Sequence, residues 1–436
     1  MRQPKLADNS QMARSDPDHV IVIGAGAAGL MAARELGRAG KRVTILEARD
    51  RCGGRINPLP AAEFGYPAEG GAEFVHGGAP VTRALLREGG LSLLPIEGMQ
   101  RTIVEGKLLS ENPLEIHEAK LHAALRKLKD DITVAEFLRR QFAGSEYDRL
   151  RRSIERMVEG YDAADPEQAS TLALRDEWMD DGRSTQVRIA GGYGGLIDFL
   201  VKSCRSHGAE IQLGTVVKAI DYAGVGAIVR CDSGDAHECG AVVLTVPLPL
   251  LKDIALPSME RERVAAAALI GFGNVIKILM RFDTRWWLEG LKDLADLTFL
   301  LSEERIPVWW TQHPSALPVL TGWSGGPKTA LMDQLNEQEL IEAGLASLAD
   351  IFGRDPKQLM RGLVASKAIN WAKDRFARGA YSYATTETRA AQSVLSTSTG
   401  GAVFYSGEAL YRGRDIGTVE AALAGGLATA RTVLST

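Results

Sequence analysis

The most constraining feature of this chain is a glycine-rich turn between a short apolar strand and a helix. Residues 19–23 (His-Val-Ile-Val-Ile) form a β-branched, apolar run that is typical of a buried parallel strand. The turn Gly24-Ala-Gly-Ala-Ala-Gly29 follows, and the pattern then predicts a helix over 30–40 and a second buried strand over 42–46. These segments together predict one βαβ unit of an α/β fold.

Each glycine of this turn has a physical role in a dinucleotide site. Gly24 permits the tight turn, Gly26 lets the backbone approach a pyrophosphate, and Gly29 lets the helix pack closely on the strand. The helix N-terminus offers free N–H groups to the phosphates. Glu47 follows about 20 residues later, where a carboxylate accepts the ribose hydroxyls. Because G-x-G-x-x-G alone is weak evidence, this context carries the prediction.

The bulk composition narrows the class of protein. With 436 residues the chain is expected to form two domains, and 45% hydrophobic with 24% charged residues is the balance of a soluble globular protein. The net charge of −4 offers no basic face for nucleic acid. Nucleic acid is therefore not an expected partner.

The cysteines and the N-terminal segment favour a cytoplasmic location. Cys52, Cys204, Cys231 and Cys239 show no C-x-x-C or zinc-finger spacing, which favours reduced thiols and leaves a Cys231–Cys239 disulfide open. The polar residues 1–18 lack the apolar core of a signal peptide and predict a flexible leader. No stretch is long and apolar enough to suggest a membrane span.

Strand-like and helix-like stretches alternate in a way that predicts two interleaved domains. Helical periodicity with mixed charge fills 82–185, strand patterns return over 186–246, and a last strand at 402–405 leads to a helix near Thr418. The predicted domains are a leader (1–18), a dinucleotide-binding domain (19–80, 186–262 and 366–434) and a substrate-binding domain (81–185 and 263–365).

The loop after Glu47 bears on which dinucleotide is bound. Gly53 and Gly54 allow close backbone approach, and Arg51 or Arg55 offers a planar fork to phosphate oxygens. For Arg55 this role is favoured over a solvated surface charge, whereas for Arg51 both interpretations stay open.

The run from Glu47 to Ile56 resembles the second flavin motif of the FAD-dependent amine oxidase family. That family includes monoamine oxidases, polyamine oxidases and lysine-specific histone demethylases. Further segments similar to this family follow in order along nearly the whole chain. They are residues 69–77, 190–195, 214–220, 275–278, 371–382, 405–409 and 417–421.

The resemblance implies a Rossmann-like FAD-binding domain interleaved with an α+β substrate-binding domain, the amine oxidase or glutathione-reductase-2-like fold. It also implies a set of residues that bind FAD. They are Gly24, Gly26, Ala28, Gly29, Glu47, Ala48, Arg49, Gly54, Arg55, Gly71, Ala72, Glu73, Val217, Trp371, Gly407, Glu408, Thr418 and Val419.

Two departures from the family pattern refine this expectation. Monoamine oxidases attach FAD through a cysteine just before the tyrosine of the flavin wall, and here that position is Ala380. FAD is therefore expected to be non-covalent. Tyr381 takes one place of the aromatic cage, but Thr418 takes the other, as in polyamine oxidases and histone demethylases.

The implied reaction oxidises the C–N bond of an amine to an imine by hydride transfer to flavin N5. Dioxygen then reoxidises the flavin to give H2O2, and the imine hydrolyses to an aldehyde or ketone. By resemblance Lys277 holds a water against N5, Tyr381 flanks the substrate with its ring face, and His76 is a polar substrate contact. The helix near Thr418 directs its positive end at the flavin N1–C2=O edge. No metal is expected.

Each of the three catalytic candidates has a structural alternative. Lys277 is otherwise an edge-strand lysine in solvent, Tyr381 a buried packing residue, and His76 a hydrogen-bonded structural histidine. The expected partners are a small-molecule amine and O2, without nucleic acid or membrane, for a monomer or homodimer.

Rival functions share the same scaffold. An L-amino-acid oxidase needs a cation for the substrate carboxylate; residues 71–76 offer Glu73 and no arginine, while Arg183, Arg188 and Arg281 lie elsewhere. A flavin desaturase is a second alternative, and a low-turnover flavoprotein that acts as a binding module is a third.

Overall fold

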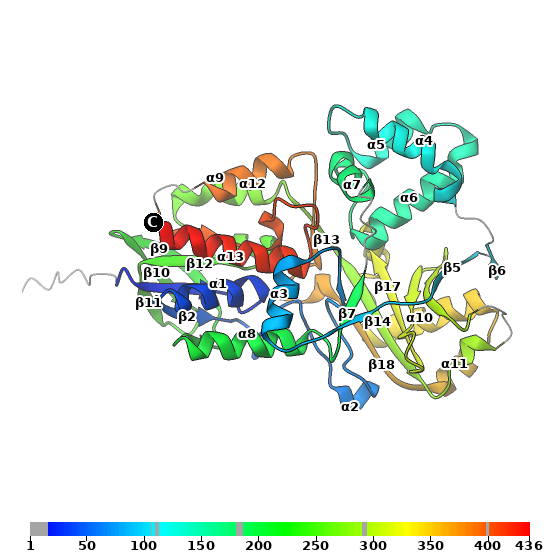
Figure 1. Cartoon of the computed structure of the whole chain (residues 1–436), viewed down its shortest axis with the longest axis horizontal. Helices are drawn as coiled ribbons and strands as arrows, with labels where there is room; N and C mark the ends of the chain where they lie inside the picture. Colours follow the sequence, from blue (N-terminus) through cyan, green and yellow to red (C-terminus); the bar gives the residue numbers. More distant parts are fainter. Residues whose placement is uncertain (1–15, 105, 110–112, 180–185, 290–293, 398–400) are drawn as a thin grey trace, which may run out of the picture.

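The computed structural model describes residues 16–104, 106–109, 113–179, 186–289, 294–397 and 401–436. Figure 1 shows two halves side by side, one built on a sheet with helices on it and the other on a larger sheet with a separate helical group above it. Part of the predicted leader and Arg183 fall outside the described residues. The predicted domain boundaries stay a proposal.

The nucleotide half is built on a five-stranded parallel sheet with the order β20-β12-β1-β2-β8. Its strands come from three distant parts of the sequence, which is the interleaving that the sequence predicts. They are β1 (His19–Ile23), β2 (Arg42–Leu46), β8 (Glu210–Gln212), β12 (Ala241–Leu244) and β20 (Val403–Tyr405).

Both faces of this sheet are covered, which explains the continuous apolar run of β1. Val20 and Val22 face one hydrophobic cluster, whereas Ile21 and Ile23 face the other. The first face packs against α1 (Ala27–Arg38), α8 (Gly194–Ser206) and α13 (Val419–Ser435). The second packs against β9 (Val217–Ala223), β10 (Gly226–Cys231), β11 (Ala236–Cys239), α9 (Arg261–Ala267) and α12 (Thr388–Ser396).

Helices α1 and α13 approach each other closely although they lie at opposite ends of the chain. A methyl group at Gly426 of α13 would overlap the carbonyl oxygen of Ala28 in α1. The glycine therefore sets the distance between the two helices.

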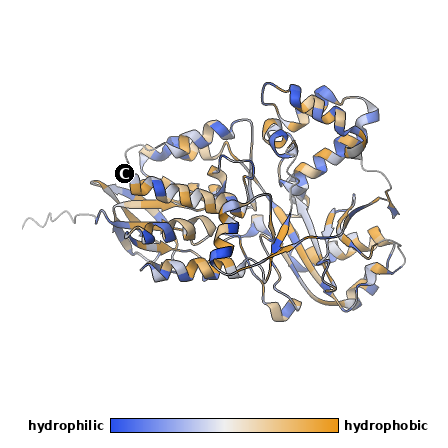
Figure 2. Cartoon of the chain, viewed as in Figure 1, coloured by the Kyte–Doolittle hydropathy of each residue, from blue (hydrophilic) through white to orange (hydrophobic). Residues whose placement is uncertain are grey.

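The second half is built on a mixed seven-stranded sheet with the order β18-β14-β17-β16-β15-β5-β6. Figure 2 shows that its strands are largely hydrophobic, as expected of a sheet that packs against helices. The strands are β5 (Met99–Val104), β6 (Lys107–Leu108), β14 (Val275–Phe282), β15 (Leu297–Leu301), β16 (Val308–Trp310), β17 (Val319–Gly325) and β18 (Leu363–Asn370). Its core includes side chains of α10 (Glu337–Phe352) and α11 (Pro356–Gly362).

Four helices form a separate group with its own core. They are α4 (Pro113–Lys127), α5 (Val134–Gln141), α6 (Asp148–Tyr161) and α7 (Thr171–Trp178). The side chains of Thr133 and Ser170 cap α5 and α7, and the two residues form an isolated β-bridge. This pairing fixes the start of α7 beside the start of α5.

Short elements link the halves. They are β3 (Phe74–Val75), β4 (Leu93–Pro95), β7 (Val187–Ile189), β13 (Gly271–Gly273), β19 (Tyr381–Tyr383), α2 (Ala61–Phe64) and α3 (Pro80–Glu88). The 3-10 helices are Ser145–Tyr147, Leu248–Asp253, Ser258–Glu260, Trp286–Leu288, Pro327–Met332, Trp371–Lys373 and Glu408–Leu410.

The predicted first helix begins three residues earlier than expected. Gly24 has a left-handed φ of 105°, and Gly26 is the N-cap, so the last residues of the turn already lie in α1. All four cysteines are free thiols, which answers the open question on Cys231 and Cys239. Among the described residues, no helix has the length and apolar character to cross a bilayer.

Candidate active site

A cavity of about 1080 Å³ is lined by residues of both halves. Its lining runs from the glycine-rich turn, along the ends of the strands, to helices α6 and α7. Every cofactor-binding and catalytic residue predicted from the sequence lines this cavity except Gly29. Gly29 lies beneath it, where a methyl group would overlap the Gly24 carbonyl oxygen, so its role is to let α1 pack on the turn.

The nucleotide end of the cavity is held together by backbone groups. Glu47 is buried and accepts hydrogen bonds from the amides of Ala25 (2.7 Å to Oε2) and Arg49 (2.9 Å to Oε1). No side chain caps α1. Its first N–H groups are therefore available to an anion at the cavity wall.

The space above this turn fits a pyrophosphate. A methyl group at Gly26 would find nothing nearer than the Gly53 carbonyl oxygen, at 4.0 Å. Both Gly26 and Gly54 line the cavity, and Gly54 has a left-handed φ of 59°. The backbone thus offers a small-residue cradle that side chains do not fill.

The two arginines of the loop have different roles. Arg51 donates to the carbonyl oxygens of Cys52 (3.2 Å), Gly54 (3.0 Å) and Ile56 (2.9 Å), and it does not line the cavity. It therefore fixes the loop. Arg55 lines the cavity, so its position is compatible with a role as a phosphate ligand. The position of Arg51 is not compatible with that role.

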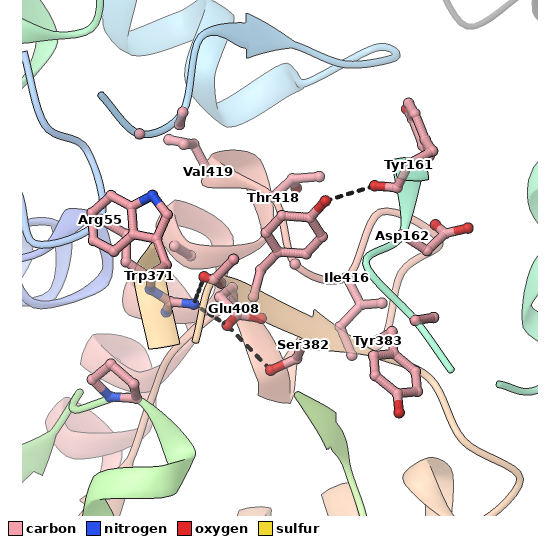
Figure 3. A pocket seen from close by; sticks show the side chains of 18 of the residues that line it. Arg55, Tyr161, Asp162, Trp371, Ser382, Tyr383, Glu408, Ile416, Thr418 and Val419 are labelled. Carbon is pink, nitrogen blue, oxygen red and sulfur yellow. Dashed lines mark hydrogen bonds and ion pairs between the residues drawn. The ribbon is translucent and has the colours of Figure 1, made fainter. Parts of the chain in front are cut away.

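Arg55 and Glu408 form the middle of the cavity wall. Arg55 donates to Glu408 Oε1 at 2.7 Å and to the Ala380 carbonyl oxygen at 2.8 Å, and Ser382 also donates to Glu408 (Figure 3). Glu408 Oε2 is buried without a hydrogen-bond partner among the described residues. Buried acceptors normally have a hydrogen-bond donor, and Glu408 lines the cavity, so this oxygen is available to a donor of a bound molecule.

The guanidinium of Arg49 is bound by a carboxylate of the protein. It forms a bidentate pair with Asp374, with distances of 2.8 and 2.6 Å. This pair joins the loop after β2 to the segment that follows Trp371. Arg49, Val217 and Trp371 line the same cavity, so the wall is assembled from three distant segments.

Lys277 is fully buried in β14, between β17 and β18, and is not an edge-strand lysine in solvent. Its Nζ donates to Glu73 Oε2 at 2.9 Å and to the Gly71 carbonyl oxygen at 3.1 Å. An ammonium has three N–H donors, so one remains after these two bonds. Lys277 also lies 5.3 Å from the centre of the Trp310 ring.

Glu73 is the centre of a charged network rather than a single contact. Its Oε1 also accepts from Arg188 (3.1 Å), Trp310 Nε1 (3.1 Å) and Gln312 (3.2 Å). Burial alone raises the pKa of Glu73, but Lys277 and Arg188 outweigh it and lower the pKa to about 2. Glu73 is therefore ionised, and it forms an ion pair with Lys277. The sequence motif marks Glu73 but not these partners.

Tyr381 and His76 both meet the C-terminal end of α6. The Tyr381 hydroxyl donates to the Tyr161 carbonyl oxygen at 2.7 Å, a bond drawn in Figure 3. The Tyr161 hydroxyl lies 2.9 Å from His76 Nδ1. Burial lowers the pKa of His76 to about 4, which keeps its imidazole neutral near pH 7. Both interpretations of His76 are compatible with this geometry.

Helix α13 begins at the cavity as predicted. Thr418 is its N-cap and accepts from the amide of Ala421 at 3.1 Å. Thr418 and Val419 line the cavity, so the positive end of the helix dipole faces it (Figure 3).

Two groups of charged residues in this cavity were missed by sequence reasoning. Asp162, Glu177 and Asp415 line the cavity wall, as do Arg149, Arg152 and Arg156. The three arginines are spaced at i, i+3 and i+7, so their common helix face was visible in the sequence. The acidic residues come from different segments and share no sequence pattern.

A family model described as flavin containing amine oxidoreductase matches residues 27–434. The lysine-specific histone demethylase 2 of Homo sapiens is 26% identical over 428 residues, which cover 90% of this chain and 50% of that protein. Probable polyamine oxidase 4 of Arabidopsis thaliana is 28% identical over 411 residues, which cover 84% of this chain and 76% of that protein. The chain thus spans about half the length of the histone demethylase.

Solved structures share the fold. Putrescine oxidase bound to putrescine has a TM-score of 0.78 and 20% identity, with 96% of this chain and 99% of that chain covered. Cyclohexylamine oxidase from Brevibacterium oxydans IH-35A has a TM-score of 0.78 and 21% identity, with 96% and 98% covered. The predicted fold class is confirmed.

The family match agrees with the motifs and with the backbone cradle, and no cysteine of the described residues lines the cavity. This lining is compatible with the expected FAD held without a covalent bond. The chain belongs to the flavin-containing amine oxidoreductases.

Proposed function

We propose that this protein oxidises a C–N bond of a small-molecule amine to an imine. In balanced form, R2CH–NHR′ and O2 give R2C=NR′ and H2O2, and water then converts the imine to a carbonyl compound and an amine. The observation that carries the proposal is the buried Lys277 ammonium, which lines the same cavity as Tyr381 and the N-terminus of α13.

Bound FAD supplies the two-electron acceptor for this chemistry. The residues at the nucleotide end hold it. Glu47, which is fixed by two backbone amides, would accept the ribose hydroxyls, and Glu408 would offer its unpaired oxygen to a donor of the cofactor. The positive end of α13 favours the negative charge that develops on the reduced cofactor.

Lys277 is proposed to position a water at the reacting centre. Two of its N–H donors are fixed by Glu73 and by the Gly71 carbonyl oxygen, which leaves one donor for a water. Because Lys277 Nζ is paired with the ionised Glu73, we propose that Lys277 acts there as a hydrogen-bond donor. Such a donor can assist a proton transfer through the water.

Tyr381 is proposed to orient the amine with its ring. Its hydroxyl is fixed on the Tyr161 carbonyl oxygen, so the ring cannot turn freely. A ring face favours a cationic or polarised nitrogen beside it. His76, neutral near pH 7, is proposed as a hydrogen-bonding contact of the same wall.

The L-amino-acid oxidase alternative loses two of its three candidate cations. Arg188 is bound to Glu73 and to the Thr311 carbonyl oxygen, and Arg281 does not line the cavity. Arg183 lies outside the described residues. The arginines of α6 replace them as candidates, because Arg149 and Arg152 line the cavity and have no ion pair among the described residues.

The proposed partners are a small-molecule amine and O2, without nucleic acid or membrane, and the protein is proposed to be a cytoplasmic monomer or homodimer. The free thiols support the location, because disulfides are rare in the cytoplasm. The net charge of −4 argues against binding to nucleic acid.

Anaerobic mixing of the purified flavoprotein with a panel of amines and amino acids tests the function. We expect amines to bleach the flavin absorbance without oxygen and to yield peroxide in air. If neither occurs with any amine while the flavin is bound, the protein is a low-turnover flavoprotein and the proposal is wrong. Bleaching by an amino acid alone supports the L-amino-acid oxidase, and a product with a new C=C bond supports the desaturase.

A further inference from the structure

We propose that Asp162 and Glu177 bind a second, distal cationic group of the substrate, so that the preferred substrate is a diamine or polyamine. The inference rests on the proposed amine oxidation and specifies its substrate class. It assigns a specificity role to two side chains in the helical group, outside every motif that identified the cofactor site.

The backbone turns Asp162 into the cavity directly after α6. Asp162 is the C-cap of α6, and Ala163 has a left-handed φ of 51°, which is unusual for alanine. A methyl group at Gly273 would overlap the Ala163 carbonyl oxygen, so β13 holds this turn in place. Figure 3 shows Asp162 on the same side of the cavity as Tyr161 and Ile416.

Glu177 reaches the same region from α7. Asp162 and Glu177 both line the cavity, and the charge of Glu177 raises the pKa of Asp162. Burial and the charges of Asp162, Tyr161 and Glu177 raise the pKa of Tyr381, which lines the same cavity. The two carboxyl groups therefore lie near the Tyr381 side chain, which we place beside the reacting amine. A substrate that reaches from Tyr381 to this pair needs a chain between its two nitrogens.

The pair has no cation of its own among the described residues. Asp162 Oδ2 is buried without a hydrogen-bond partner, and neither Asp162 nor Glu177 forms an ion pair there. Burial and the charge of Glu177 raise the pKa of Asp162, and burial and the charge of Asp415 raise that of Glu177 to about 7. Buried carboxyl groups in this state take up either a proton or a cation.

The surroundings favour an organic cation over a metal ion. No group of three or more metal-ligating side chains exists among the described residues. Aromatic residues adjoin both acids in sequence, Tyr161 before Asp162 and Trp178 after Glu177, and both rings line the cavity with Tyr383. Aromatic faces and carboxylates together are the usual environment of a bound ammonium group.

Other charged residues also face the cavity and define the competing outcome. Arg149, Arg152 and Arg156 line it from α6, and Arg156 is paired with Glu303 at 3.0 Å. Arg414 and Asp415 line it from the segment before α13. An amine that carries a carboxylate would be drawn to the α6 arginines instead of the acid pair.

A matched series of substrates tests the proposal on the holoenzyme. We compare n-butylamine, 1,4-diaminobutane, longer diamines and 4-aminobutanoate by the rate of anaerobic flavin reduction and by kcat/KM in air. We expect a diamine to exceed the monoamine of equal carbon number in kcat/KM by about 10- to 150-fold, the range of one charge-assisted hydrogen bond.

Isosteric variants locate the effect. Asp162→Asn and Glu177→Gln are expected to reduce the diamine-to-monoamine ratio by about 10-fold or more and to leave the monoamine rate within about 3-fold. Asp176→Asn is the control, because Asp176 neighbours Glu177 on α7 but is exposed, pairs with Arg175 and does not line the cavity. Melting temperature and flavin content verify that each variant folds.

Binding without turnover gives a second readout. In the dithionite-reduced enzyme under nitrogen the amine cannot be oxidised, so calorimetry measures affinity alone. We expect 1,4-diaminobutane to bind more tightly than n-butylamine. Near pH 7 its binding should also displace a proton from the carboxyl pair into solution. Both effects should weaken in Glu177→Gln. This arm keeps the test valid if Asp162→Asn does not fold.

The proposal is overturned if Asp162→Asn and Glu177→Gln both keep the native diamine-to-monoamine ratio of kcat/KM and the native difference in affinity. The two carboxyl groups would then only share a proton. It is also overturned if 4-aminobutanoate is preferred, which would assign specificity to the α6 arginines. Failure of every amine to reduce the flavin would instead contradict the proposed function itself.

Discussion

The two ends of the cavity differ in the groups that line them, which are mainly backbone groups at one end and side chains at the other. At the nucleotide end, glycines and backbone amides form much of the wall, and the carboxylate of Glu47 is fixed by the amides of Ala25 and Arg49. At the substrate end, the wall contains charged and aromatic side chains such as Glu73, Lys277 and Tyr381, which have partners far away in sequence.

This difference indicates which parts of the sequence determine cofactor binding and which determine substrate binding. Binding of the cofactor depends on local backbone geometry, which a short motif specifies. Binding of the substrate depends on electrostatic interactions between elements that only the complete fold brings together. Perturbing the first end should remove the cofactor, while perturbing the second should change charge balance and selectivity.

The largest effect is expected at the nucleotide end, where two neighbouring glycines separate packing from cofactor binding. Gly29→Ala forces a methyl group into the Gly24 carbonyl oxygen and should destabilise the protein by about 3 kcal/mol or more. Gly26→Ala has room in the protein and should keep apoprotein stability within about 1 kcal/mol while losing flavin. Chemical unfolding and the flavin-to-protein absorbance ratio measure both. Equal stability of the two variants would contradict the distinction.

At the substrate end, breaking the ion pair between Lys277 and Glu73 should lower the unfolding free energy by nearly as much. Among the described residues, Lys277→Met leaves Arg188 as the only ion-pair partner of the buried Glu73 carboxylate, and it should cost about 3 kcal/mol of unfolding free energy. It should also slow one half-reaction measured by stopped flow. The double variant with Glu73→Gln should recover part of the stability. Additive losses in the double variant, or unchanged rates in both half-reactions, would refute the assigned role.

A smaller effect concerns the pH dependence that His76 contributes. Its pKa is lowered from 6.5 to about 4, so the unfolded state takes up its proton first. The contribution of His76 to stability is complete above pH 6.5 and is lost as the pH falls to about 4, by at most about 3 kcal/mol. His76→Gln should flatten the unfolding free energy over this range, whereas the exposed His207→Gln should not. Parallel pH profiles for all three proteins would contradict the shift.

The smallest effect is expected for the hydroxyl of Tyr381. Tyr381→Phe removes the hydrogen bond to the Tyr161 carbonyl oxygen and should cost about 1 kcal/mol. Flavin content and the rate of flavin reduction should stay close to native, because the ring remains. A loss of rate with unchanged stability would show that the hydroxyl, and not the ring, acts on the substrate.

Sequence reasoning was strongest where a property is local. The strand, turn and helix of residues 19–46 and the helix that starts at Thr418 lie where their patterns predict them, with ends shifted by a few residues. Gly24 and Gly29 are required by the turn itself, since one has a positive φ and the other contacts a carbonyl oxygen. Such constraints do not depend on the rest of the fold.

Prediction from the sequence was weakest where the partner of a side chain is remote in the chain. Arg51 and Arg55 look equivalent in the sequence, but only the folded loop shows that Arg51 donates to three carbonyl groups of that loop. Lys277 could be placed in a strand, yet its burial follows from the neighbouring strands β17 and β18. Asp162 and Glu177 could not be paired at all, because nothing in their sequence spacing records that two helices meet at one cavity.

The packing of α13 on α1 has a consequence for biosynthesis. The glycine-rich turn is synthesised well before Thr418, Val419 and Gly426, the residue that contacts α1. A nascent chain therefore has only part of the flavin wall, and the cofactor can be fully retained only after residues 419–435 have docked. We therefore expect stable binding of FAD to follow the synthesis of α13 and its docking on α1.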